Sequence, residues 1–99
     1  MLDSNRIFYC IHTEYKNSNL ASLVSKFFDC YAIFEGTGFW KGIPEHAARI
    51  EIIGTEDDRN KVIALADWIC TVNGQEAVYV TSYPVLLDDI RIERKKIAA

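Results

Sequence analysis

The stretch ARIEII, residues 48–53, alternates apolar and polar side chains more cleanly than any other part of the chain. Successive side chains of a β-strand point to opposite faces of the sheet. Ala48, Ile50 and Ile52 therefore share one face, and Arg49, Glu51 and Ile53 share the other. We predict a strand over residues 47–53 that buries the first face in a core and leaves the second face polar and available.

A helix is predicted directly after this strand. Gly54 interrupts the strand, Thr55 is a capping residue, and Asp58 lies three positions further on, as in a capping box. The pair Asn73-Gly74 supplies the helix end, because glycine adopts the left-handed conformation that terminates helices. Apolar residues recur between these limits at helical spacing, and the expected core stripe is Val62, Leu65, Ala66 and Ile69.

In the rest of the chain, β-branched and aromatic residues predict further strands over residues 6–15, 31–35 and 77–82, and Pro84 ends the last of these. Apolar residues with helical periodicity predict a helix from residue 19 to residue 28 or 29. The order strand, helix, strand, strand, helix, strand predicts an α+β, ferredoxin-like βαββαβ sandwich, with a four-stranded antiparallel sheet and two helices on one face. We expect residues 1–84 to form this domain and residues 85–99 to be a C-terminal tail or edge extension.

Composition excludes several classes of protein. A chain of 99 residues is one domain, and its net charge of −3 argues against duplex nucleic acid as a partner, because the basic residues cluster only in the tail. No segment reaches the ~20 apolar residues of a membrane helix, and the first residues lack a signal-peptide pattern. The three cysteines, Cys10, Cys30 and Cys70, lack metal-binding spacing. We therefore expect a cytoplasmic protein with buried free thiols, no metal and no cofactor.

The stretch FEGTGFWKGIP, residues 34–44, is the strongest candidate for a ligand site. Gly36 and Gly38 permit positive φ and a close approach of backbone N–H groups to a ligand. Phe39 and Trp40 offer rings for stacking, and Lys41 offers a cation for phosphate or carboxylate. Neither the P-loop nor the dinucleotide-binding glycine pattern is present. The alternative is a β-hairpin with a glycine bulge whose aromatic side chains pack on a neighbouring subunit.

Two further sets of polar residues have open interpretations. Arg49 contacts an anionic ligand or forms a structural ion pair with Glu51, its neighbour on the exposed face. His12 and His46, paired with Glu14 or Glu45, could act as an acid–base pair, provided that a histidine lies in a cleft beside a carboxylate. We place the first and third strands as parallel neighbours, so the two histidines need not meet. No nucleophile of known context accompanies them, and we expect no catalytic residues.

Two helices cover only one face of such a sheet, and the other face carries apolar residues, so we expect a homo-oligomer. The element order, the glycine-containing excursion, and the helix that ends at Asn73-Gly74 before QEAVYV, residues 75–80, resemble the PII-like group of small trimeric proteins. This group includes the PII signal-transduction proteins and the CutA proteins. The resemblance implies a trimer that binds ligands such as adenine nucleotides in clefts between subunits. It also implies that residues 36–42 occupy the loop beside these clefts, although the loop is shorter here than in PII proteins. The third strand has an acid and no aromatic residue, unlike an RNA-recognition module.

The sequence thus predicts a non-enzymatic, oligomeric binding protein for a small anionic, nucleotide-like ligand. The protein would sense a metabolite or sequester a nucleotide signal, as small proteins of phage origin do. The expected ligand-binding residues are Gly36, Gly38, Phe39, Trp40, Lys41 and Arg49. The alternative function is a protein-interaction module whose aromatic hairpin docks on a partner or on a neighbouring subunit.

Overall fold

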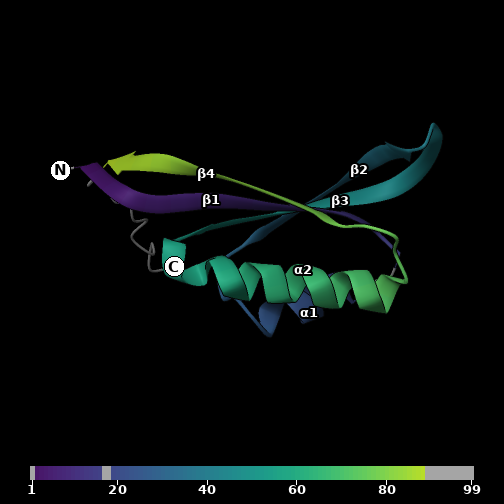
Figure 1. Cartoon of the computed structure of the whole chain (residues 1–99), viewed down its shortest axis with the longest axis horizontal. Helices are drawn as coiled ribbons and strands as arrows, with labels where there is room; N and C mark the ends of the chain where they lie inside the picture. The colour runs from purple at the N-terminus through teal and green to yellow at the C-terminus, as the bar shows by residue number, and fades with distance from the viewer. Residues whose placement is uncertain (1, 17–18, 89–99) are drawn as a thin grey trace, which may run out of the picture.

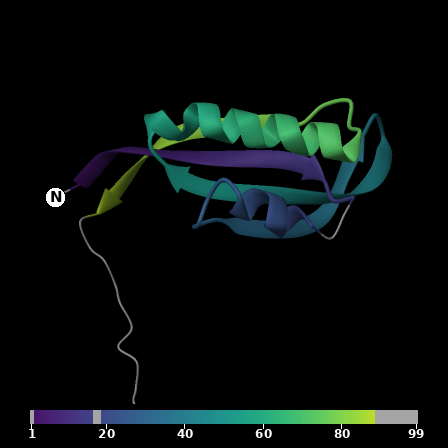
Figure 2. The same ribbon diagram turned by 90° about the horizontal axis from the view of Figure 1, so that it is seen from below.

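Four strands and two α-helices make up the part of the chain that the computed structural model describes, residues 2–16 and 19–88. They follow in the order β1 (Leu2–Glu14), α1 (Leu20–Ser25), β2 (Ala32–Trp40), β3 (Ile43–Gly54), the 3-10 turn η1 (Glu56–Asp58), α2 (Arg59–Asn73) and β4 (Tyr79–Asp88). The sheet has the order β2-β3-β1-β4, and every neighbouring pair is antiparallel. Both helices lie against one face of the sheet, and the other face is uncovered (Figures 1 and 2). The predicted ferredoxin-like fold is confirmed.

The core lies between the sheet and the helices. Ile11 of β1 faces Ile50 of β3 across the ladder, and both side chains are fully buried. The predicted alternation in β3 is confirmed, because Ala48, Ile50 and Ile52 are buried while Ile53 is 53% exposed. The predicted stripe of α2 is confirmed as well. The rest of the cluster is Tyr9, Leu20, Val24, Val62, Leu65, Ala66 and Ile69.

The ends of α2 have the predicted local chemistry. The backbone N–H of Thr55 donates to the Asp58 carboxylate at 2.9 Å, and the Asp58 backbone N–H donates to the Thr55 carbonyl at 3.0 Å. The residues of this capping box form η1 before the α-helix begins at Arg59. Gly74 follows the helix with φ +62°, the left-handed conformation expected at this position.

Several predicted bounds and one strand direction are wrong. β1 and β3 are antiparallel, not parallel, so Ala48 pairs with Thr13 and Gly54 pairs with Ile7. β4 does not end at Pro84 but continues to Asp88, since an edge strand tolerates the missing N–H of proline. α1 ends at Ser25, and a hydrogen-bonded turn continues to Phe28, whose N–H bonds the Val24 carbonyl at 3.0 Å. The division between residues 1–84 and 85–99 stays a prediction, because residues 89–99 lie outside the described part.

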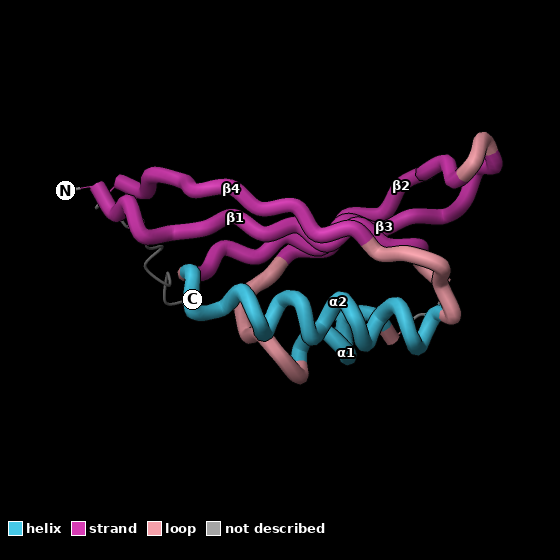
Figure 3. The backbone as a smooth tube through the Cα atoms, viewed as in Figure 1, coloured by secondary structure: helices cyan, strands magenta, loops and turns pink. Residues whose placement is uncertain are grey.

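The glycine-rich stretch is not a loop but the end of a long hairpin. β2 pairs with β3 without interruption from Ala32 opposite Glu51 to Trp40 opposite Ile43. Only Lys41 and Gly42 form the turn, with φ values of 51° and 79°, as in the tight turns that join twisted strands. Gly36 and Gly38, which permit positive φ, do not adopt it in this extended pairing. The hairpin bends away from the helices and extends beyond the rest of the sheet (Figure 3).

The three cysteines differ in their exposure to solvent. Cys10 is buried and Cys70 is partly buried, but Cys30 is exposed, so the expectation of three buried thiols is wrong for Cys30. Cys30 lies in the turn that follows α1, outside the core.

Within residues 2–16 and 19–88, no helix combines the length and the apolar character needed to cross a membrane.

Candidate functional site

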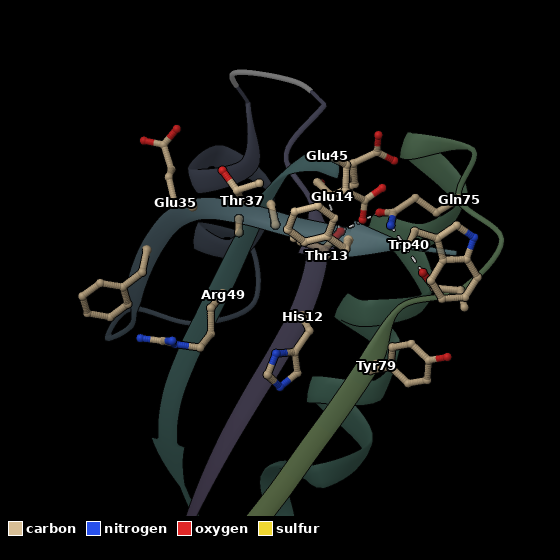
Figure 4. Close-up of a pocket in the computed structure, with 17 residues that line it drawn as sticks. His12, Thr13, Glu14, Glu35, Thr37, Trp40, Glu45, Arg49, Gln75 and Tyr79 are labelled. Carbon is tan, nitrogen blue, oxygen red and sulfur yellow. Dashed lines mark hydrogen bonds between the residues drawn. The ribbon is translucent and has the colours of Figure 1, made fainter. Parts of the chain in front are cut away.

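A hollow of about 400 Å³ lies at the end of the sheet where the β2–β3 hairpin bends. Its lining comes from all four strand regions and from the loop between α2 and β4, as Figure 4 shows. Trp40 and Tyr79 stand at one side, with ring centroids 6.3 Å apart. Phe34 also lines the hollow, and the Arg49 guanidinium lies over its ring, 5.0 Å from the centroid. Aromatic rings together with a few polar groups are features of small-molecule sites.

Five of the six residues predicted to bind a ligand line this hollow. These are Gly36, Gly38, Phe39, Trp40 and Arg49. Lys41 is the exception, because the turn directs its ammonium to the Glu76 carboxylate, 3.4 Å away. Phe39 lines the hollow only in part, since 68% of its surface is exposed.

The two glycines provide space rather than unusual backbone angles. A Cβ built on Gly36 would meet no atom within 4 Å, so a side chain there would extend into open space. A Cβ on Gly38 would lie 3.1 Å from the Ala47 Cβ on the neighbouring strand. Larger residues at these positions would reduce the volume of the hollow.

The titratable side chains that line the hollow are Arg49, His12, Glu14, Glu35 and Glu45, and Glu35 pairs with His46. Arg49 and His12 are paired across β3 and β1, and they lie together at one end (Figure 4). Glu14 and Glu45 lie at the other end, beside Gln75 and Trp40. Within the described residues, the bond from Arg49 Nε to Glu51, at 2.7 Å, is the hydrogen bond that the Arg49 side chain makes. The structural ion pair that we considered for Arg49 therefore forms, yet the terminal guanidinium nitrogens remain available to an anion.

Partly buried hydrogen bonds anchor Gln75 to β1. The Thr13 hydroxyl donates to Gln75 Oε1 at 2.5 Å, and Asn73 Nδ2 donates to the same oxygen at 2.8 Å. Asn73 Nδ2 also bonds the Glu14 carbonyl at 3.0 Å. Thr13 is only 5% exposed, so these groups have little access to water. The network fixes the α2–β4 loop against the end of β1.

Thr13→Val should lower the free energy of unfolding by about 0.5–1.5 kcal/mol, because it removes one of the two donors to Gln75 Oε1 and leaves Asn73 Nδ2 as the other. Chemical denaturation with urea measures the change. Thr71→Val is the matched control, since the Thr71 hydroxyl bonds the Asp67 carbonyl on the exposed side of α2. Equal stability of wild type and Thr13→Val would contradict an anchoring role for this hydroxyl.

Neither histidine forms the acid–base pair that we considered. His12 lines the hollow, but its Nε2 contacts the Thr81 hydroxyl at 3.0 Å rather than a carboxylate. His46 pairs with Glu35 at 3.1 Å and stacks on Tyr15, and more than half of its side chain is exposed. Burial raises the pKa of the Cys10 thiol, which disfavours the thiolate needed for attack. No group of three metal-ligating residues occurs in residues 2–16 and 19–88.

Three residues of this region were missed by the sequence analysis as site residues: Gln75, Glu76 and Tyr79. They belong to the segment between the end of α2 and the start of β4, far in sequence from the hairpin. The fold brings the two segments to the same end of the molecule (Figures 1 and 2). No local sequence signal marks these residues, because their role depends on this long-range contact.

Comparison with known proteins shows the fold and no closer relationship. No family profile matches the sequence, and no curated protein matches it. The crystal structure of a DUF3240 family protein from Shewanella baltica OS155 matches with a TM-score of 0.62 and 9% identity, over 97% of this chain and all of that one. CutA from Synechococcus elongatus PCC7942 matches with a TM-score of 0.53 and 12% identity, over 87% of this chain and 83% of that one. The chain therefore has a CutA-like, ferredoxin-like fold, which confirms the predicted resemblance at the level of structure.

Proposed function

We propose that this protein is a non-enzymatic, cytoplasmic homo-oligomer, with a trimer favoured, that binds a small anionic, nucleotide-like ligand in the hollow beside the β2–β3 hairpin. One observation carries the proposal. Residues chosen from the sequence for stacking and for anion contact, Trp40 and Arg49, line the same hollow although nine positions separate them on adjacent strands. The protein would serve as a sensor or as a sequestering sponge.

The orientation of the ligand follows from the separated charges. An anionic group is favoured at Arg49 and His12, since among the described residues Arg49 bonds Glu51 through Nε and not through its terminal nitrogens. Glu14 and Glu45 repel an anion but accept hydrogen bonds from ring amino groups. The aromatic ring of the ligand would lie against Trp40, at the end of the hollow that holds Glu14 and Glu45. We also propose that the Lys41 ammonium contacts an anion at the hairpin tip.

The uncovered sheet face supports the oligomer. Phe8 and Tyr83 stack there with ring centroids 5.0 Å apart, and Tyr83 and Ile53 are each more than half exposed. Exposed apolar patches usually mark association surfaces. Native mass spectrometry of the protein purified from cells tests both parts of the proposal. A trimer that carries a few hundred daltons of extra mass per site is the expected result, whereas a bare monomer would contradict it.

Arg49→Ala should weaken binding of ATP by about tenfold or more, because a charge-assisted hydrogen bond contributes ~1.5–3 kcal/mol. Binding of adenosine, which lacks phosphate, should change little in the same variant. Isothermal titration calorimetry with both compounds measures the difference. Arg59→Ala is the control, since Arg59 pairs with Glu56 at the start of α2. Equal losses for ATP and adenosine would remove Arg49 from the anion site.

The exposed tip favours a second candidate, a protein-interaction module. Phe39 and Ile43 are both 68% exposed at the end of the hairpin. Apolar side chains in such a position suit an interface with a partner or with a neighbouring subunit. In that case Phe39→Ala should change the mass of the assembly and leave ATP affinity unaltered.

A further inference from the structure

Glu76 connects the α2–β4 loop to the tip of the hairpin. Trp40 Nε1 donates to one Glu76 carboxylate oxygen at 3.3 Å, and Lys41 Nζ lies 3.4 Å from the other. The Lys41 ammonium also lies over the Trp40 ring, 5.7 Å from its centroid. The Glu76 carboxylate thus bonds both Trp40, the last residue of β2, and Lys41, the first residue of the turn.

The Trp40 ring lies at the boundary between two hollows. The larger hollow, of about 400 Å³, adjoins a smaller one of about 210 Å³ that extends beneath the α2–β4 loop. Five residues line both, and Trp40 is the one aromatic residue among them; the others are Glu14, Glu45, Gln75 and Ala77. Glu76 lines only the smaller hollow. Trp40 therefore lies where the two hollows adjoin.

The loop and the tip differ in how firmly they are held. Gln75, next to Glu76, is fixed by Thr13 and Asn73, and its N–H bonds the Cys70 carbonyl at 3.0 Å. The hairpin tip extends beyond the helices (Figure 1), and Lys41 and Ile43 are exposed. Segments with few buried contacts open most easily. The loop is thus the fixed support, and the tip is the part that can move.

We propose that Glu76 is a positioning residue that holds the Trp40 ring as a partition between the two hollows. The position of this partition sets the length of ligand that the pocket formed by the two hollows admits. With the partition closed, the pocket takes a compact ligand with one ring system and one anionic group. With it released, the pocket takes an elongated ligand whose second part enters the smaller hollow, beside Lys16 and Gly74. This inference rests on the proposed function, because it concerns the same site.

The partition itself is tested without a ligand. The chain has two tryptophans, so in a Trp68→Phe background the fluorescence reports on Trp40 alone. Adding Glu76→Ala should raise the acrylamide quenching constant about two-fold, since contacts between exposed side chains shift populations by modest factors. Glu76→Gln should give an intermediate value, because its amide oxygen still accepts from Trp40 while the ion pair with Lys41 is lost. Glu45→Gln, which removes a nearby carboxylate that does not bond Trp40, is the control. An unchanged quenching constant in Glu76→Ala would overturn the partition.

The effect on ligand length is tested with AMP as the compact probe and NAD⁺ as the elongated probe. Glu76→Ala should increase NAD⁺ affinity at least about three-fold and leave AMP affinity within about two-fold. Equal changes for both nucleotides would overturn the role of Glu76 in length selection. If neither nucleotide binds any variant while quenching still responds to Glu76→Ala, the proposed function fails and the partition stands.

Discussion

We expect Ile50→Ala to lower the free energy of unfolding by about 2–5 kcal/mol, the range found when buried aliphatic side chains are truncated to alanine. Ile50 is fully buried and lies between Ile11 of β1 and Ile33 of β2, above the helices. Its neighbours on two strands are held by backbone hydrogen bonds, so they cannot collapse fully into the cavity. For a domain of this size the Tm should fall by about 10–25 °C. Thermal unfolding followed by circular dichroism measures it.

Ile53→Ala is the matched control for this experiment, because it removes the same atoms from the opposite face of the same strand. Ile53 is 53% exposed, so the loss should stay within about 1 kcal/mol at low protein concentration. A loss that grows with protein concentration would show that the uncovered face is buried in an oligomer. Equal losses for Ile50→Ala and Ile53→Ala in a monomer would contradict the assignment of the two faces.

Alternation and helical periodicity predicted the core because each depends only on local geometry. Side chains on one face of a strand recur every two residues, which placed Ala48, Ile50 and Ile52 on the buried face. Side chains on one face of a helix recur every 3.6 residues, which placed the apolar stripe of α2 in the same core. The helix ends followed from equally local chemistry, at Thr55 with Asp58 and at Gly74. These signals need no knowledge of distant residues.

The hairpin was one of two interpretations of the sequence, and its full extent was not predicted because long-range pairing determines it. Gly36 and Gly38 have low strand propensity, but continuous pairing with residues 45–47 of β3 keeps them extended. The available signal was Lys41-Gly42 between Trp40 and Ile43, a two-residue turn with glycine in its second position. Glu76 gave no such signal, because its partners Trp40 and Lys41 lie more than thirty positions away, and only the fold brings them together.

Trp40→Ala should weaken ATP binding about 5- to 150-fold, because stacking of a base on an aromatic side chain contributes ~1–3 kcal/mol. Trp40 is partly buried against Tyr79 and lines both hollows, so it offers the largest aromatic side chain to a ligand there. Its removal should change the Tm little, because the ring lies outside the hydrophobic core. Isothermal titration calorimetry measures the affinity, and native mass spectrometry measures the assembly.

Trp68→Ala provides the control, since Trp68 packs edge-on against Phe27 on the helix layer and does not line either hollow. It should leave ATP affinity unchanged although it removes the same side chain. The two variants together separate the two functions considered for the hairpin. Weaker binding by Trp40→Ala in an assembly of unchanged mass supports the ligand site. Unchanged affinity with an altered mass would instead make Trp40 an interface residue, and the hollow would then lie between protein surfaces.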